Sequence, residues 1–135
     1  MPEGTFLHAV NDEVLQLQVE PIEGAAGQAR RAVRAWMAGL HLSPVLVDDV
    51  LLVVSELVTN AALHARTTAR VVARWDGEHV LIEVFDTDSR PPVILNESPT
   101  VGGWGLRLVD QLSRTWGCDA GSDGKRVWAQ VGETR

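Results

Sequence analysis

Residues 50–65 read VLLVVSELVTNAALHA, and this run predicts how the rest of the chain is organised. Glu56 is its only formally charged side chain. A helical wheel at about 100° per residue gives a broad apolar face and two narrow polar sectors. One contains Asp49, Glu56, Asn60 and His64, together with Leu46 and Val53, and the other contains Asp48, Ser55 and Thr59. The run therefore predicts a largely buried helix that carries polar groups along one edge.

The elements on either side of this helix are predicted from hydrophobic period and turn residues. Ser43 followed by Pro44 is a helix start signal, so the helix is expected to run from about residue 45 to residue 65. Helices are also expected over residues 23–40 and 106–112. Strands are expected at residues 14–19, 70–75, 79–85, 114–119 and 126–131.

This order of elements predicts an α+β fold. Hairpin-linked strands favour a mixed, mostly antiparallel sheet, and grouped helices favour a layer on one face, which together give a two-layer α/β sandwich. A doubly wound fold is excluded because strands and helices do not alternate. The length of 135 residues suits a single domain over residues 1–135, with residues 1–12 expected to be a flexible N-terminus.

Composition limits the classes of function. The net charge of −6 argues against general nucleic-acid binding, which needs a basic face. No apolar run reaches the roughly 20 residues of a membrane helix, and no secretory signal is evident, so a cytoplasmic protein without a membrane partner is expected. The single cysteine, Cys118, excludes an internal disulfide framework and is expected to be a small core residue.

Glu56 and Asn60 lie four residues apart and therefore on one face of the predicted helix. A carboxylate and an amide both offer oxygen atoms, which hard cations such as Mg²⁺ prefer. A buried carboxylate without a partner is costly, so a bound ligand or cation would explain Glu56 on a mostly apolar helix. The alternative is that both side chains lie at the edge of an amphipathic helix and meet solvent.

Two further features are candidates for ligand contacts. Asp86 ends an apolar strand, where an ionised carboxylate can accept hydrogen bonds from an exocyclic amine; the alternative is a turn aspartate. Gly102, Gly103 and Gly105 precede the short helix, and free N–H groups at a helix N-terminus favour phosphate. Ordinary loop glycines are the alternative. Neither a P-loop nor a Rossmann fingerprint is present.

Taken in order, three segments resemble the nucleotide-binding boxes of the GHKL ATPases, the superfamily of gyrase, histidine kinases and the mismatch-repair ATPase MutL. SELVTNAALHA at residues 55–65 is similar to the N box, VFDTDSRPP at residues 84–92 to a reduced first glycine box, and GGWGLRLVDQLSRTWG at residues 102–117 to the second. Within this superfamily the chain most resembles the small, single-domain anti-sigma-factor serine kinases. The resemblance implies the Bergerat ATP-binding fold, with ATP and Mg²⁺ as ligands.

The resemblance also implies roles for individual residues. Glu56 would be the general base, Asn60 would hold Mg²⁺, and Asp86 would accept the adenine amino group. The remaining residues implied to contact the nucleotide are His64, Gly102, Gly103, Trp104, Gly105 and Leu106.

The function implied is that of an ATP-dependent serine/threonine kinase that regulates transcription. It would bind a sigma factor and phosphorylate a serine of an anti-sigma-factor antagonist, and a homodimer like those of the family is left open. The alternative is a non-catalytic, nucleotide-binding partner-switching module. Glu56 favours the kinase, whereas three departures from the family pattern favour the module: Asp88 in place of glycine, Trp104 in place of arginine, and Arg126 in place of a threonine near the adenine.

Overall fold

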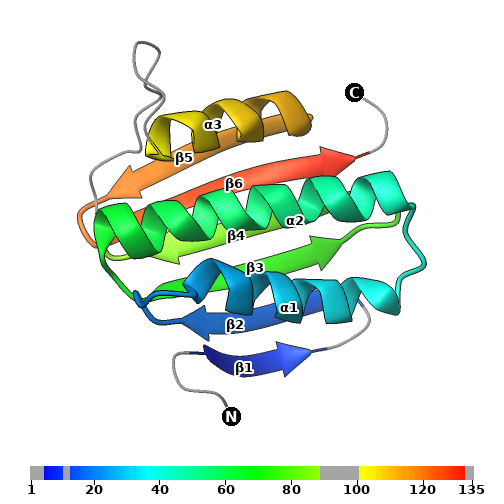
Figure 1. The fold of residues 1–135 in the computed structure, drawn as a ribbon, viewed down its shortest axis with the longest axis horizontal. Coiled ribbons are helices and arrows are strands. Elements are labelled where there is room, and N and C mark those ends of the chain that lie inside the picture. The colour runs from blue at the N-terminus through cyan, green and yellow to red at the C-terminus, as the bar shows by residue number, and fades with distance from the viewer. Residues whose placement is uncertain (1–4, 11–12, 89–100, 133–135) are drawn as a thin grey trace.

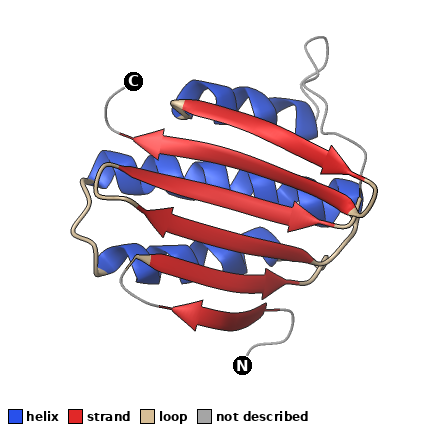
Figure 2. Cartoon of the chain, turned by 180° about the vertical axis from the view of Figure 1, so that it is seen from behind, coloured by secondary structure: helices blue, strands red, loops and turns tan. Residues whose placement is uncertain are grey.

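A computed structural model describes residues 5–10, 13–88 and 101–132 of the chain. These residues form two layers, a six-stranded sheet and helices that cover one of its faces (Figure 1). Seen from behind, the strands lie in front and all helices lie beyond them (Figure 2). The predicted α+β sandwich with helices on one face is therefore confirmed.

The strand order is β1-β2-β3-β4-β6-β5, and every neighbouring pair is antiparallel. Most strands and helices begin and end close to where the sequence predicts. The strands are β1 (Thr5–Val10), β2 (Val14–Val19), β3 (Ala69–Trp75), β4 (His79–Asp86), β5 (Thr115–Gly121) and β6 (Gly124–Gly132). The helices are α1 (Ala25–Ala38), α2 (Pro44–Thr59), the π-helix η1 (Asn60–Ala65) that continues α2, and α3 (Val101–Leu112).

The core lies between the sheet and the helices. Alternate residues of each central strand point toward the helix layer, as the period of two requires. On β4 these are Val80, Ile82 and Val84, which are buried with Val50 and Val54 of α2 in one apolar cluster. The largely buried character predicted for α2 is confirmed, and Cys118 packs against the same cluster.

The prediction of a flexible N-terminus over residues 1–12 is wrong for Thr5–Val10. These residues form β1, which pairs with β2 and has a register irregularity between Leu7 and Ala9. Pairing with the edge of β2 satisfies main-chain groups that would otherwise need water. The local sequence could not reveal this, because the hydrogen-bonding partner is supplied by a separate strand.

The start of α2 allows a direct test of helix capping. The side chain of Ser43 accepts a hydrogen bond from the backbone N–H of Leu46 at 3.2 Å. Ser43→Ala should therefore lower the free energy of unfolding by about 1 kcal/mol, measured by denaturant titration, because an N-terminal N–H loses its acceptor. Ser43→Asp restores an acceptor and should stay close to wild type. Equal unfolding midpoints for Ser43→Ala and wild type would contradict the capping role.

Candidate nucleotide site

Three segments that are distant in sequence meet at one end of the sandwich. Figure 1 places the end of η1, the C-terminal end of β4 and the start of α3 at the same side of the molecule. Contacts join η1 to both β4 and α3. The elements that carry the predicted site residues are therefore brought together. The side chains of residues 63–65 and 101–105, and the loop at residues 89–100, lie outside what the structure describes.

Glu56 and Asn60 occupy the last turn of α2 and its junction with η1. The backbone N–H of Asn60 donates to the carbonyl oxygens of Glu56 and Leu57. Burial raises the pKa of the Glu56 carboxyl above its usual value. The Nδ2 atom of Asn60 is buried and has no hydrogen-bond partner among the described residues. A fully solvated helix edge would show neither feature, so this end of the helix is partly withdrawn from solvent.

The helix changes geometry at this point. Asn60–Ala65 is π-helical, and it ends at Arg66, a non-glycine residue with a φ of 56° whose N–H donates to the carbonyl oxygen of Ala61. A π-helix has hydrogen bonds between residues five apart instead of four, and such segments occur often at functional sites. The hydrogen-bonding pattern of the helix therefore changes at Asn60, while Ala61 and Ala62 of η1 remain buried. His64 lies within this segment.

Asp86 is buried at the end of β4, with its side chain 2% exposed. One carboxylate oxygen, Oδ1, accepts hydrogen bonds from the backbone N–H of Asp88 at 2.9 Å and from Lys125 Nζ at 3.0 Å. The other, Oδ2, lies 3.0 Å from the same ammonium. Asp86 is therefore more than a surface turn residue, and its carboxylate already faces a cation supplied by the chain.

The expectation that Arg126 lies near the base-binding end of the site is wrong. Asp86 pairs in register with Lys125, so the next residue of β6 points to the opposite face of the sheet. There the Nε atom of Arg126 donates to Glu83 at 2.6 Å. The alternation of Lys125 with Val127 and Ala129 on the buried side of β6 was the sequence signal that could have identified Lys125.

The glycine run lies inside a helix instead of preceding one. Helix α3 begins at Val101, so Gly102, Gly103 and Gly105 belong to its first turns together with Trp104. The first four N–H groups of an α-helix lack partners within the helix, which makes them donors for an anion. Leu106 is 1% exposed, so only its main chain could contact a solvent-side ligand.

The fit of a magnesium ion can be judged from the donor groups. Among the described residues, no cluster of three or more His, Cys, Asp or Glu side chains could hold a metal by itself. Mg²⁺ in nucleotide sites is commonly held by one or two protein oxygens together with phosphates. Asn60 can present Oδ1 to such an ion while its buried Nδ2 donates to a phosphate oxygen or water. The residues therefore suit a metal that arrives with the nucleotide.

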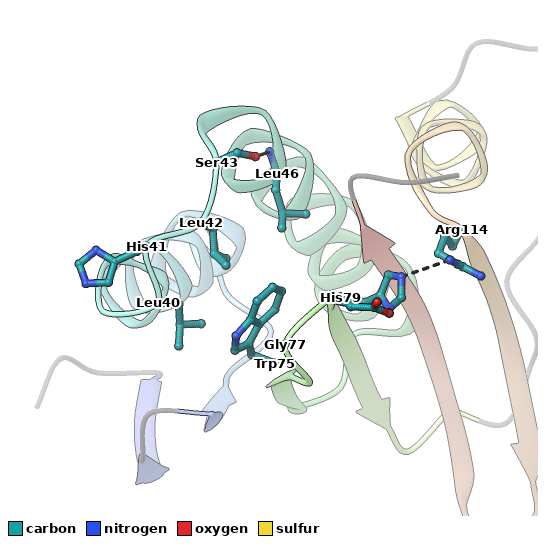
Figure 3. A pocket seen from close by; sticks show the side chains of 10 residues that line it. Leu40, His41, Leu42, Ser43, Leu46, Trp75, Gly77, His79 and Arg114 are labelled. Atoms are coloured by element: carbon teal, nitrogen blue, oxygen red, sulfur yellow. Dashed lines mark hydrogen bonds and ion pairs between the residues drawn. The ribbon is translucent and has the colours of Figure 1, made fainter.

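A cavity of about 420 Å³ lies at the other end of the sandwich (Figure 3). None of the residues predicted for the nucleotide site line it. Leu40, Leu42 and Trp75 contribute apolar side chains, and Nε2 of His79 lies 3.2 Å from Nη1 of Arg114 on the opposite side. This cavity is thus separate from the predicted site.

An antiparallel sheet covered on one face by helices, with an N-box helix end beside the acidic end of β4, defines a protein of the GHKL ATP-binding class. The family profile described as "Histidine kinase-like ATPase domain" matches residues 20–131, and the chain belongs to that family. The suspected GHKL membership is thereby confirmed. Among the described residues, no helix is both long and apolar enough to cross a membrane.

Comparison with solved structures supports the same fold. The chain is similar to the crystal structure of the RsbU and RsbW domains of Rv1364c from Mycobacterium tuberculosis, with a TM-score of 0.66 and 21% sequence identity. The match covers 87% of this chain and 32% of that one, so the present chain spans about a third of the length of this relative. Comparison with curated protein sequences gave no significant match.

Proposed function

We propose that this protein binds Mg-ATP at the end of α2 and transfers the γ-phosphoryl group to a serine of an anti-sigma-factor antagonist. It would act in the cytoplasm, as a regulator of transcription that also binds a sigma factor. The observation that carries the proposal is the partial burial of the polar groups of Glu56 and Asn60 at the end of α2. This end of the helix lies on the same side of the sandwich as the end of β4 and the start of α3.

The proposed chemistry assigns one task to each group. Glu56 accepts the proton of the attacking serine hydroxyl, and its raised pKa makes the carboxylate a better base near neutral pH. Asn60 orients the magnesium-bound phosphates, and the N–H groups at the start of α3 donate to phosphate oxygens. Phosphoryl transfer depends mainly on positioning and charge stabilisation, and this small set of groups supplies both.

The choice of partners rests on the similarity of the three sequence boxes to the anti-sigma-factor kinases. The fold likeness to a structure that contains RsbU and RsbW domains supports the same choice. In a partner-switching system the chain would bind its sigma factor until the antagonist displaces the sigma factor from the chain. We also propose that residues 1–135 act as one domain. Whether the purified protein forms a homodimer can be measured by analytical sedimentation.

The second candidate is a nucleotide-binding partner switch that transfers no phosphate. The ion pair between Asp86 and Lys125 favours this function, because a carboxylate already paired with an ammonium forms a weaker hydrogen bond with the amino group of adenine. The Asp88 main chain is also engaged with this pair, through both its N–H and its carbonyl oxygen.

Calorimetric titration with ATP, with and without Mg²⁺, is the first test. Saturable binding that is stronger with Mg²⁺ is expected. Radiolabelled transfer to an antagonist domain that carries a candidate acceptor serine then separates the two candidates. Binding with transfer supports the kinase, binding without transfer supports the switch, and the absence of binding by folded protein overturns both.

Asn60→Ala should abolish the dependence of ATP binding on Mg²⁺. The substitution removes the amide oxygen that would face the metal and the buried Nδ2 that has no described partner. We expect the enhancement of ATP affinity by Mg²⁺, about tenfold or more in wild type, to disappear in calorimetry. Thr59→Ala is the matched control, since it changes the preceding residue on another side of the helix. Equal enhancement in wild type and Asn60→Ala would make Asn60 structural.

A further inference from the structure

The ion pair between Lys125 and Asp86 lies where the proposed site would bind the adenine ring of ATP. The Lys125 ammonium is 3.0 Å from both carboxylate oxygens of Asp86, and the two side chains are only 7% and 2% exposed. It also donates to the carbonyl oxygen of Asp88 at 3.0 Å. Surface ion pairs contribute little, but a buried pair that also has a hydrogen bond to the main chain is much harder to open.

The strand register holds Lys125 in this position. Asp86 and Lys125 are direct partners on the antiparallel strands β4 and β6. Gly124 has a φ of 141°, and a Cβ at this residue would overlap the carbonyl oxygen of Asp86 and lie 2.9 Å from the Cα of Thr87. The two main chains therefore approach closely just before Lys125. This approach fixes the start of the side chain, so only its flexible end can move.

The acceptor capacity of Asp86 is largely used by this arrangement. An ionised carboxylate has about four acceptor directions. The Asp88 N–H takes one direction, and the ammonium of Lys125 takes one on each oxygen. A neutral amino group that approaches Asp86 must displace a charge-assisted bond, which is roughly twice as strong as a neutral one. Even beside the pair, it would meet a carboxylate whose charge is already compensated.

We infer that Lys125 is a specificity-determining residue that competes with the adenine amino group for Asp86 and so lowers the affinity of the site for ATP. The inference rests on the proposed nucleotide function, because it concerns the base-binding end of that site. The protein then gains little affinity from the amino group of the base. Most of its nucleotide affinity comes from the phosphates and the metal.

Lys125→Met tests the competition directly, since methionine keeps an unbranched apolar chain and removes the ammonium. The dissociation constant of Mg-ATP should fall about tenfold, measured by calorimetry. Arg126→Met is the matched control. It removes the same charge from the adjacent residue of β6, but on the opposite face of the sheet, and it should leave the affinity unchanged. An unchanged or weaker affinity in Lys125→Met would overturn the inference.

A second measurement uses the wild-type protein, because removing one partner of a buried ion pair can prevent folding. Purine riboside triphosphate carries hydrogen in place of the amino group of ATP. If Lys125 occupies Asp86, wild type should bind the two nucleotides with affinities within about threefold, whereas a direct bond from the amino group would give a preference of about tenfold or more for ATP. That preference in wild type would overturn the inference.

The two failures can be distinguished. If wild type binds Mg-ATP and already discriminates against the analogue, the proposed function stands and only the role of Lys125 fails. If neither wild type nor Lys125→Met binds Mg-ATP while both show cooperative thermal unfolding, the proposed function fails and the inference fails with it.

Discussion

Glu56→Gln should leave the binding of Mg-ATP close to wild type and lower phosphoryl transfer by about two to four decades, the usual scale for a general base. Glutamine preserves the size of the side chain and its hydrogen-bonding reach but cannot accept the serine proton. Transfer is measured with radiolabelled ATP and an antagonist domain that carries the acceptor serine. Binding is measured separately by calorimetry.

Asp49→Asn is a suitable control, because it makes the same kind of change about two turns earlier on the same polar sector of α2. It should leave the transfer rate unchanged. Equal transfer by Glu56→Gln and wild type would remove Glu56 from the chemistry. Transfer by neither protein, with binding intact, would favour the partner-switching module.

The same substitution has a pH signature that does not depend on activity. Burial raises the folded-state pKa of Glu56 above its ordinary value of 4.5, so ionisation is less favourable in the folded chain than in the unfolded chain. The contribution of Glu56 to stability is therefore fully present below that unfolded value and is lost as the pH rises through the raised one. Glu56→Gln cannot ionise, so it should melt above wild type at pH 7.5. This difference should shrink as the pH falls toward 4.5, whereas equal melting temperatures at every pH would indicate a solvated carboxylate.

Gly124→Ala should produce the largest loss of stability, on the order of 2 to 4 kcal/mol. The φ of 141° at Gly124 is a conformation that residues with a side chain rarely adopt, and the new Cβ would overlap the carbonyl oxygen of Asp86. Because the overlapping atom belongs to the main chain, the ends of β4 and β6 would have to separate. Thermal melting should show a decrease on the order of 10 °C.

Gly121→Ala provides the comparison within the same hairpin. A Cβ at Gly121 meets nothing within 4 Å, and its φ is outside the positive range, so the variant should remain within about 1 kcal/mol of wild type. A similar loss in both variants would mean that the hairpin tolerates no side chain at either glycine. An unchanged melting temperature for Gly124→Ala would show that β4 and β6 can separate without cost.

Local sequence signals predicted most elements of the fold because their causes are local. Ser43 and Pro44 fixed the start of α2, and alternation in residues 14–19 gave β2 with its buried face. The turn at Asp76 was predictable for the same reason: its side chain accepts hydrogen bonds from the N–H groups of Glu78 and His79, two and three residues on. The sequence boxes also predicted that the ends of α2 and β4 carry the site. The roles proposed there for Glu56, Asn60 and Asp86 remain predictions.

What the sequence alone determined is therefore most of the elements, their order and the family. The tertiary structure alone decided that Thr5–Val10 pairs with β2, that the end of α2 becomes π-helical, and that Lys125 reaches Asp86 while Arg126 lies on the other face. The physical reason is that periodicity reports which residues share a face of one strand, but not which residue of another strand lies opposite. Asp86 and Lys125 are 39 residues apart, and only the register of β4 against β6 places an ammonium on that carboxylate.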